Sequence, residues 1–152
     1  MKRLLLIEEQ FLVDRFTPVI QSWGYEVVGI SKSDFVLEVI KRHQVDIIVL
    51  AKEMRISGEA LYEMIRDNPD ASMNEHLAKL HHTKVDFEWG LWLTKTIREA
   101  GVKLPIICLT TDELPGPQMQ YETDDVFFDA VVSKQNNPEF YSQLENVLRQ
   151  AK

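Results

Sequence analysis

The sequence has little cysteine and no long apolar run. Its single cysteine, Cys108, cannot form an internal disulfide, and its position in an apolar segment predicts a buried side chain. No segment has the long uncharged run of a membrane span, and the apolar run at residues 4–7 is too short for a signal peptide. We therefore expect a cytoplasmic protein that has no membrane partner.

An excess of positive charge is also missing. The formal net charge is −7, and the lysines and arginines are scattered along the chain. Such a chain would repel a phosphate backbone, so nucleic acid is not an expected partner. Neither G-x-G-x-x-G nor a Walker motif occurs, and the first apolar run leads into acidic residues. This argues against nucleotide chemistry and leaves a small-molecule binder as a lesser alternative.

The sequence does contain short apolar runs that alternate with helical repeats. The runs predict five strands, at residues 2–7, 25–30, 45–50, 104–109 and 130–133. With 152 residues, of which 45% are hydrophobic, the chain suits a single domain spanning residues 1–152. Alternating strands and helices predict an α/β fold, with a five-stranded parallel sheet between two layers of helices.

Helical spacing follows most of these strands. The helix expected after the first strand ends at Gly24 and includes Pro18, which should kink or delay it. After the second strand Ser33 can cap a helix that turns three apolar residues to the core, namely Val36, Leu37 and Ile40. A final helix carries its apolar residues on one face, namely Phe140, Leu144, Val147 and Leu148.

Polar residues follow the expected strands at their carboxyl ends. In parallel sheets, ligands and chemistry gather at these ends, near the point where the strand order reverses. The ends supply Glu8 and Glu9, Ala51 and Glu53, Thr110 and Thr111, and Lys134.

This order of residues resembles the receiver domains of two-component response regulators, the family of the chemotaxis protein CheY. The segments DIIVLAKEM, LPIICLTT and AVVSK carry the resemblance, which covers nearly the whole chain and implies a flavodoxin-like, doubly wound sheet. In the family, an acidic pair like Glu8 and Glu9 holds magnesium, and an aspartate at the position of Ala51 accepts a phosphoryl group. A hydroxyl like that of Thr110 then moves to bind the phosphate, and a lysine like Lys134 neutralises it.

The chain departs from the family at the position that matters most. Ala51 has no nucleophile, so aspartyl-phosphate chemistry cannot occur there. Gln135 stands where proline usually follows the lysine, and Val131 replaces an aromatic residue. The chain therefore resembles a degenerate pseudo-receiver. Glu53 lies two residues beyond Ala51, but its direction and length would misplace its oxygen.

The remaining carboxylates allow two interpretations. Glu8 and Glu9 are weak candidates for Mg²⁺, because a site without the aspartate keeps fewer oxygen ligands. Alternatively, Glu8, Glu9 and Glu53 pair with Lys134 or face water.

The segment between the third and fourth strands is about twice as long as receivers need, which predicts a helical insertion at about residues 67–88. The spacing G-x-x-L-x-x-x-I-R occurs twice, from Gly58 and from Gly90, and each copy resembles the family's third helix. We expect one helix at residues 57–66 and one or two more over residues 73–100, which end at Gly101.

Aromatic residues are dense at the end of this segment. Phe87, Trp89 and Trp92 lie within six residues, which suits either core packing or a partner-binding face. Three histidines nearby lack the i, i+4 spacing of a helical metal site, so we expect them to be solvated. They are His76, His81 and His82.

The stretch at residues 112–125 contains Pro115, Gly116 and Pro117, which block a helix where receivers place their fourth. We expect a loop or a shortened helix there.

The leading hypothesis is a non-enzymatic signalling adaptor that binds a sensor kinase, another regulator, a motility or secretion component, or a second copy of itself. The main alternative is an active phosphoreceiver with a displaced acceptor.

Overall fold

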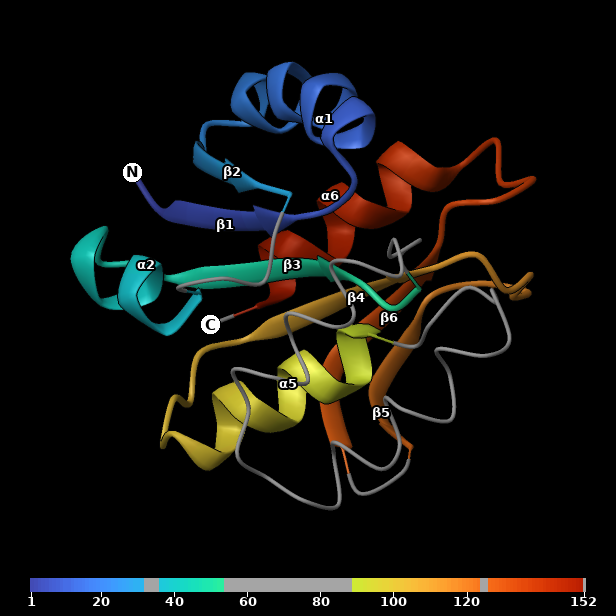
Figure 1. Cartoon of the computed structure of the whole chain (residues 1–152). Coiled ribbons are helices and arrows are strands. Elements are labelled where there is room, and N and C mark those ends of the chain that lie inside the picture. The colour runs from blue at the N-terminus through green and yellow to red at the C-terminus, as the bar shows by residue number, and fades with distance from the viewer. Residues whose placement is uncertain (32–35, 54–88, 124–125, 152) are drawn as a thin grey trace.

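A computed structural model describes residues 1–31, 36–53, 89–123 and 126–151, and all five expected strands are present in it (Figure 1). The strands are β1 (Arg3–Ile7), β2 (Glu26–Ile30), β3 (Ile47–Ala51), β4 (Ile106–Thr110), β5 (Gln118–Thr123) and β6 (Val126–Ser133). The described helices are α1 (Gln10–Ser22), α2 (Val36–Arg42), α5 (Trp89–Glu99) and α6 (Phe140–Gln150).

The strands form one sheet in the order β2-β1-β3-β4-β6-β5. The five predicted strands are all present and run parallel, so the flavodoxin-like α/β class is confirmed. Strand β2 lies on one side of β1 and β3 on the other. The strand order therefore reverses between β1 and β3, and the residues that follow these two strands stand at the switch point of the sheet.

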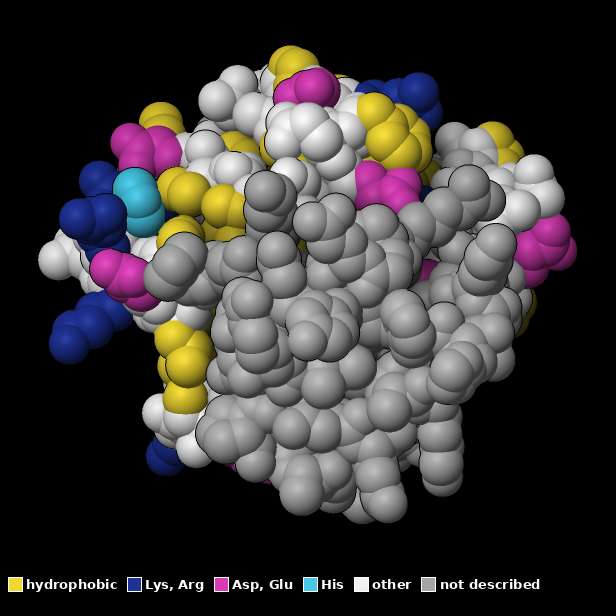
Figure 2. All heavy atoms as spheres, in the orientation of Figure 1, with side chains coloured by type: hydrophobic (Ala, Val, Ile, Leu, Met, Phe, Trp, Pro, Cys, Tyr) yellow, Lys and Arg dark blue, Asp and Glu magenta, His cyan; other side chains and the backbone are white. Residues whose placement is uncertain are grey.

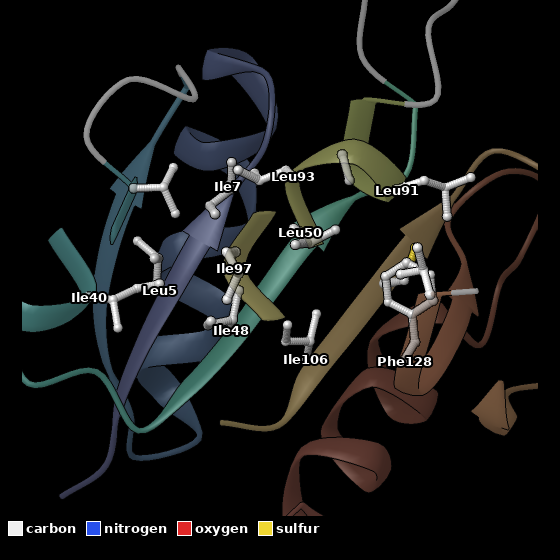
Figure 3. Packing of buried hydrophobic residues seen from close by; sticks show 14 of the residues in the cluster. Leu5, Ile7, Ile40, Ile48, Leu50, Leu91, Leu93, Ile97, Ile106 and Phe128 are labelled. Atoms are coloured by element: carbon white, nitrogen blue, oxygen red, sulfur yellow. The ribbon is translucent and has the colours of Figure 1, made fainter. Parts of the chain in front are cut away.

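Two apolar cores lie on opposite faces of the sheet. Helices α2 and α5 cover one face, which Figure 3 shows from close by, and α1 and α6 cover the other. The α5 side buries Leu93 and Ile97 against Leu50 of β3. The predicted apolar face of α6 is confirmed, since all four of its expected core residues are buried.

Two details of the helices differ from expectation. Pro18 lies inside α1 and does not delay the helix, which begins eight residues earlier at Gln10. A proline removes one hydrogen bond from the helix and crowds the carbonyl four residues earlier, but the other hydrogen bonds of α1 carry the helix past it. Leu37 does not face the core and is 38% exposed, whereas Val36 and Ile40 are buried as predicted.

The helices α1 and α5 end where the sequence predicts. Gly24 and Gly101 adopt φ angles of +97° and +85°, a left-handed conformation that glycine reaches without steric cost. Each glycine therefore terminates the helix that precedes it.

The sequence predicts a loop or a shortened helix after β4, but the structure has a loop that is followed by an additional strand, β5. Pro115, Gly116 and Pro117 do prevent a helix, and the chain then returns as β5, which pairs antiparallel with β6 at the edge of the sheet. The ladder is interrupted at Gln120, where φ is +50°. An edge strand thus stands where receivers place their fourth helix.

Several sequence predictions lie outside the described residues. These are the inserted segment, the helix at residues 57–66, the three histidines, Phe87 and the cap at Ser33. Among the described helices, none is long and apolar enough to cross a bilayer. On the described part of the face in Figure 2, Lys and Arg side chains lie interspersed with Asp and Glu.

Candidate functional site

The carboxyl ends of β1 and β6 are joined by a buried ion pair. Lys134 Nζ donates to Glu8 Oε2 at 2.7 Å, and the Glu8 side chain is 0% exposed. The other oxygen, Oε1, accepts the backbone N–H of Glu9 at 3.1 Å. Burial raises the pKa of Glu8 above its ordinary value, because desolvation outweighs the attraction of Lys134. The expected pairing of a glutamate with Lys134 therefore holds for Glu8.

Helix α5 covers the end of β3, where a receiver would carry its phosphate-accepting aspartate. Ala51 is fully buried, and Gly90 in the first turn of α5 donates its N–H to the carbonyl of Lys52 at 2.9 Å. A Cβ on Gly90 would lie only 2.1 Å from the carbonyl oxygen of Ala51. The strand tip and the helix therefore touch backbone to backbone, and glycine is required for that contact.

Glu53 does not pair with Lys134 and does not face water. Its Oε1 accepts the hydroxyl of Thr110 at 2.8 Å, and its Oε2 accepts the backbone N–H of Thr111 at 3.0 Å. The side chain of Glu53 is only 11% exposed. The Glu53 side chain therefore extends from the end of β3 to the end of β4, and neither expected use of its carboxylate, a pair with Lys134 or exposure to water, is seen.

Three residues that the sequence analysis did not select complete this arrangement. Lys52 Nζ lies 3.2 Å from Asp112 Oδ2 and 3.9 Å from Glu53 Oε1. Ser133 donates its hydroxyl to the carbonyl of Asp112 at 2.6 Å. Lys52 and Asp112 lie one and two residues beyond strand ends, and Ser133 is the last residue of β6. These positions were a usable signal, but the side-chain directions decide which of the residues meet.

The residues present do not fit the magnesium ion that the family resemblance implies. A divalent cation of this kind needs several oxygen ligands. One oxygen of Glu8 accepts the ammonium group of Lys134, Ala51 offers no side-chain oxygen, and both oxygens of Glu53 accept hydrogen bonds. Among the residues that the structure describes, no group of three or more His, Cys, Asp or Glu side chains could hold a metal.

Cys108 lies beneath these charged groups in β4 and is fully buried. Burial raises the pKa of its thiol, and the negative charge of Glu53 adds to the effect. The thiol therefore stays protonated, which agrees with its predicted role as a small buried side chain.

Of the three aromatic candidates for partner binding, only Trp92 has a described side chain. It is half-buried and packs against the core on the α5 side of the sheet. Trp89 is the first residue of α5, and Phe87 lies outside the described residues.

Comparison with known proteins gives matches at the level of structure. No protein-family model matches the sequence, and no curated protein matches it. Among solved structures, the N-terminal domain of a response regulator/sensory box/GGDEF three-domain protein from Carboxydothermus hydrogenoformans matches with a TM-score of 0.62 and 15% identity. That match covers 98% of this chain and 92% of the other.

Two further solved structures also match nearly the whole chain. A CheY-like response regulator receiver domain from Methylobacillus flagellatus has a TM-score of 0.58 and 13% identity, covering 100% of this chain and 99% of the other. A structure of histidine kinase ThkA in complex with response regulator protein TrrA matches at 0.52 and 18% identity, covering 99% of this chain and 97% of the other. The chain therefore has the fold of a response-regulator receiver domain.

Proposed function

We propose that this protein is a receiver-fold signalling adaptor that acts in the cytoplasm through protein–protein contacts, without an aspartyl-phosphate cycle and without enzymatic activity of its own. The observation that carries the proposal is Ala51. It occupies the end of β3 at the switch point, is fully buried, and lies in backbone contact with Gly90. A methyl group cannot attack a phosphodonor.

The other groups at the strand ends support the same proposal. Lys134, which in a receiver would neutralise a phosphoryl group, is held by Glu8 at 2.7 Å. Glu53, the nearest carboxylate along the chain, uses both oxygens to accept hydrogen bonds from Thr110 and Thr111. A displaced acceptor would need a carboxylate oxygen that is open to the donor, which argues against phosphorylation at Glu53.

The fold supports a proposal about the class of partner. Receiver domains are among the solved structures that resemble this chain, and one such structure contains a histidine kinase with a response regulator. We propose a partner of the two-component type, such as a sensor kinase or another regulator. The segment that carries Phe87, Trp89 and Trp92 remains our candidate for the docking surface.

Partner capture tests this proposal. We expect the immobilised full chain to retain a two-component protein from its native lysate. Treatment with acetyl phosphate and Mg²⁺ should change the Kd of the purified pair by less than about two-fold. The reason is that no covalent charge can be added at Ala51. The same assay with Trp92→Ala locates the docking surface, with the exposed neighbour Lys95→Ala as the control.

The alternatives give different results in this assay. A phosphodonor effect of about ten-fold or more on Kd would indicate an active phosphoreceiver and contradict the proposal. A coloured cofactor or nucleotide that copurifies with the chain, without any protein partner, would indicate a small-molecule binder instead.

A further inference from the structure

A cavity of about 410 Å³ lies between α1 and the start of α6. Its described lining comes from α1, from the loop between β6 and α6, from the start of α6 and from the chain just beyond β4. The volume is within the range of small-molecule sites, about 300–1,000 Å³. We infer that this cavity binds a small aromatic carboxylic acid, whose ring packs on aromatic side chains and whose carboxylate pairs with Arg15.

Aromatic side chains from both helices form the floor of the cavity. The ring centroids of Phe16 in α1 and Phe140 in α6 are 5.2 Å apart, and these side chains are only 4% and 6% exposed. Tyr141 lies 5.2 Å from Phe140 and is 37% exposed, so its ring reaches from the floor to the rim. A flat ring packs on such a set in an offset or edge-to-face geometry, which favours an aromatic ligand over an aliphatic one.

The charged residues that line the cavity within the described chain are both basic, although the whole chain has a net charge of −7. They are Arg15 and Lys134. Glu8 holds Lys134 at 2.7 Å, whereas the exposed Arg15 makes no ion pair with any residue that the structure describes. A guanidinium group binds a carboxylate through two parallel hydrogen bonds, so Arg15 is the residue that selects an acid.

The loop that forms one wall of the cavity is held in place by Asn137. Its side-chain amide donates to the Ser133 carbonyl at 2.7 Å and to Gln143 Oε1 at 2.8 Å, and its Oδ1 accepts the N–H of Glu139 at 3.2 Å. Pro138 follows with a fixed φ angle. The wall is therefore tied to β6 and to α6 before a ligand arrives, which lowers the entropy lost on binding.

A ligand in this cavity contacts α1 and α6 at once. Both helices cover the same face of the sheet, opposite α2 and α5 (Figure 1). Such a ligand gives the adaptor an input that needs no phosphoryl group, which Ala51 could not accept. That regulatory meaning rests on the proposed function, whereas the binding site rests on the lining of the cavity and its charge.

Three small probes test the inference on the ¹⁵N-labelled full chain. We expect cinnamate to shift the amide resonances of Arg15, Phe16 and Tyr141 saturably, because the cavity offers both aromatic packing and a positive charge. Cinnamamide has the same ring without the charge and should bind at least about ten-fold more weakly. Sodium acetate, which has the charge without the ring, should cause no saturable shift.

A charge-removing variant makes the test specific. Arg15→Gln should weaken cinnamate binding by about ten-fold, because the bidentate pair is lost, and should leave the Kd of cinnamamide within about two-fold. Arg42→Gln is the matched control, since Arg42 is an exposed arginine of α2 that does not line the cavity. Its affinities for both probes should equal those of the unmodified protein.

Three results would contradict the inference. They are the absence of a saturable shift with cinnamate, equal affinities for cinnamate and cinnamamide, and an Arg15→Gln variant that binds cinnamate as tightly as the unmodified protein. Shifts confined to residues outside α1, α6 and the loop before α6 would contradict it as well. The probes are measured without a protein partner, so a failed partner capture leaves these shifts unchanged and the two proposals fail separately.

Discussion

Replacement of Lys134 by methionine is expected to lower the free energy of unfolding by about 3 kcal/mol near pH 8. Lys134 is the partner of Glu8 at 2.7 Å, and the Glu8 side chain has no exposure to water. Without the ammonium group, the buried carboxylate keeps one hydrogen-bond donor within the described part of the chain, the N–H of Glu9. Urea unfolding followed by circular dichroism measures the loss.

The loss should depend on pH with a definite sign. Burial raises the pKa of Glu8 above 4.5 in the folded protein, although Lys134 opposes the shift, and removal of Lys134 raises it further. A raised folded-state pKa contributes stability that is present below the unfolded value and is lost as the pH rises through the folded value. Between these two values the variant should lose up to about 1.4 kcal/mol per pH unit, so the deficit at about pH 5 is the smaller one.

Two further variants make this prediction specific. Glu8→Leu combined with Lys134→Met should recover most of the stability at about pH 8, because an apolar pair of similar volume needs no desolvation of charge. Lys95→Met removes an exposed lysine on α5 and should change stability by less than about 0.5 kcal/mol. A deficit in Lys134→Met that grows toward acid pH would show that Glu8 is not the buried partner.

Gly90→Ala is expected to cost about 3 kcal/mol of folding free energy, measured in the same way. The added Cβ would lie 2.1 Å from the Ala51 carbonyl oxygen and 2.7 Å from the Cα of Lys52, and both of these are backbone atoms that cannot rotate away. Helix α5 must then move off the end of β3 and lose the hydrogen bond from Gly90 to Lys52.

Helix propensity alone predicts that Gly90→Ala stabilises the protein, so the sign of the measured change separates the two effects. Within a helix, alanine is favoured over glycine by about 1 kcal/mol, so a stabilised Gly90→Ala variant would contradict the close contact of α5 with Ala51. Gly116→Ala is the matched control, since a Cβ there meets no atom within 4 Å. It should alter stability by less than about 0.5 kcal/mol.

The sheet could be predicted because buried parallel strands are continuous apolar runs. The runs IIVL and IICL lead directly into the ends of β3 and β4, and their burial on both faces leaves little freedom of register. The alternation of strands and helices then fixes the layer order. The residues at the strand ends, Glu8, Ala51 and Thr110, could therefore be named from sequence alone.

The edge strand and the contacts of Glu53 could not be predicted in this way. In β5 only Met119 and Tyr121 are apolar, and Met119 is 48% exposed, so the pattern is too weak to separate a strand from a loop. The direction of the Glu53 side chain depends on which donors lie within its reach across two strands. Such a choice among rotamers leaves no trace in spacing or composition.

We expect no group at the strand ends to accept a phosphoryl group, and intact-mass analysis after incubation with acetyl phosphate and Mg²⁺ measures this. A receiver that carries the aspartate, treated in the same tube, confirms that the donor is active. The mass of this chain should remain unchanged. A gain of about 80 Da that alkali removes, or that maps to Glu53 or Glu8, would contradict it.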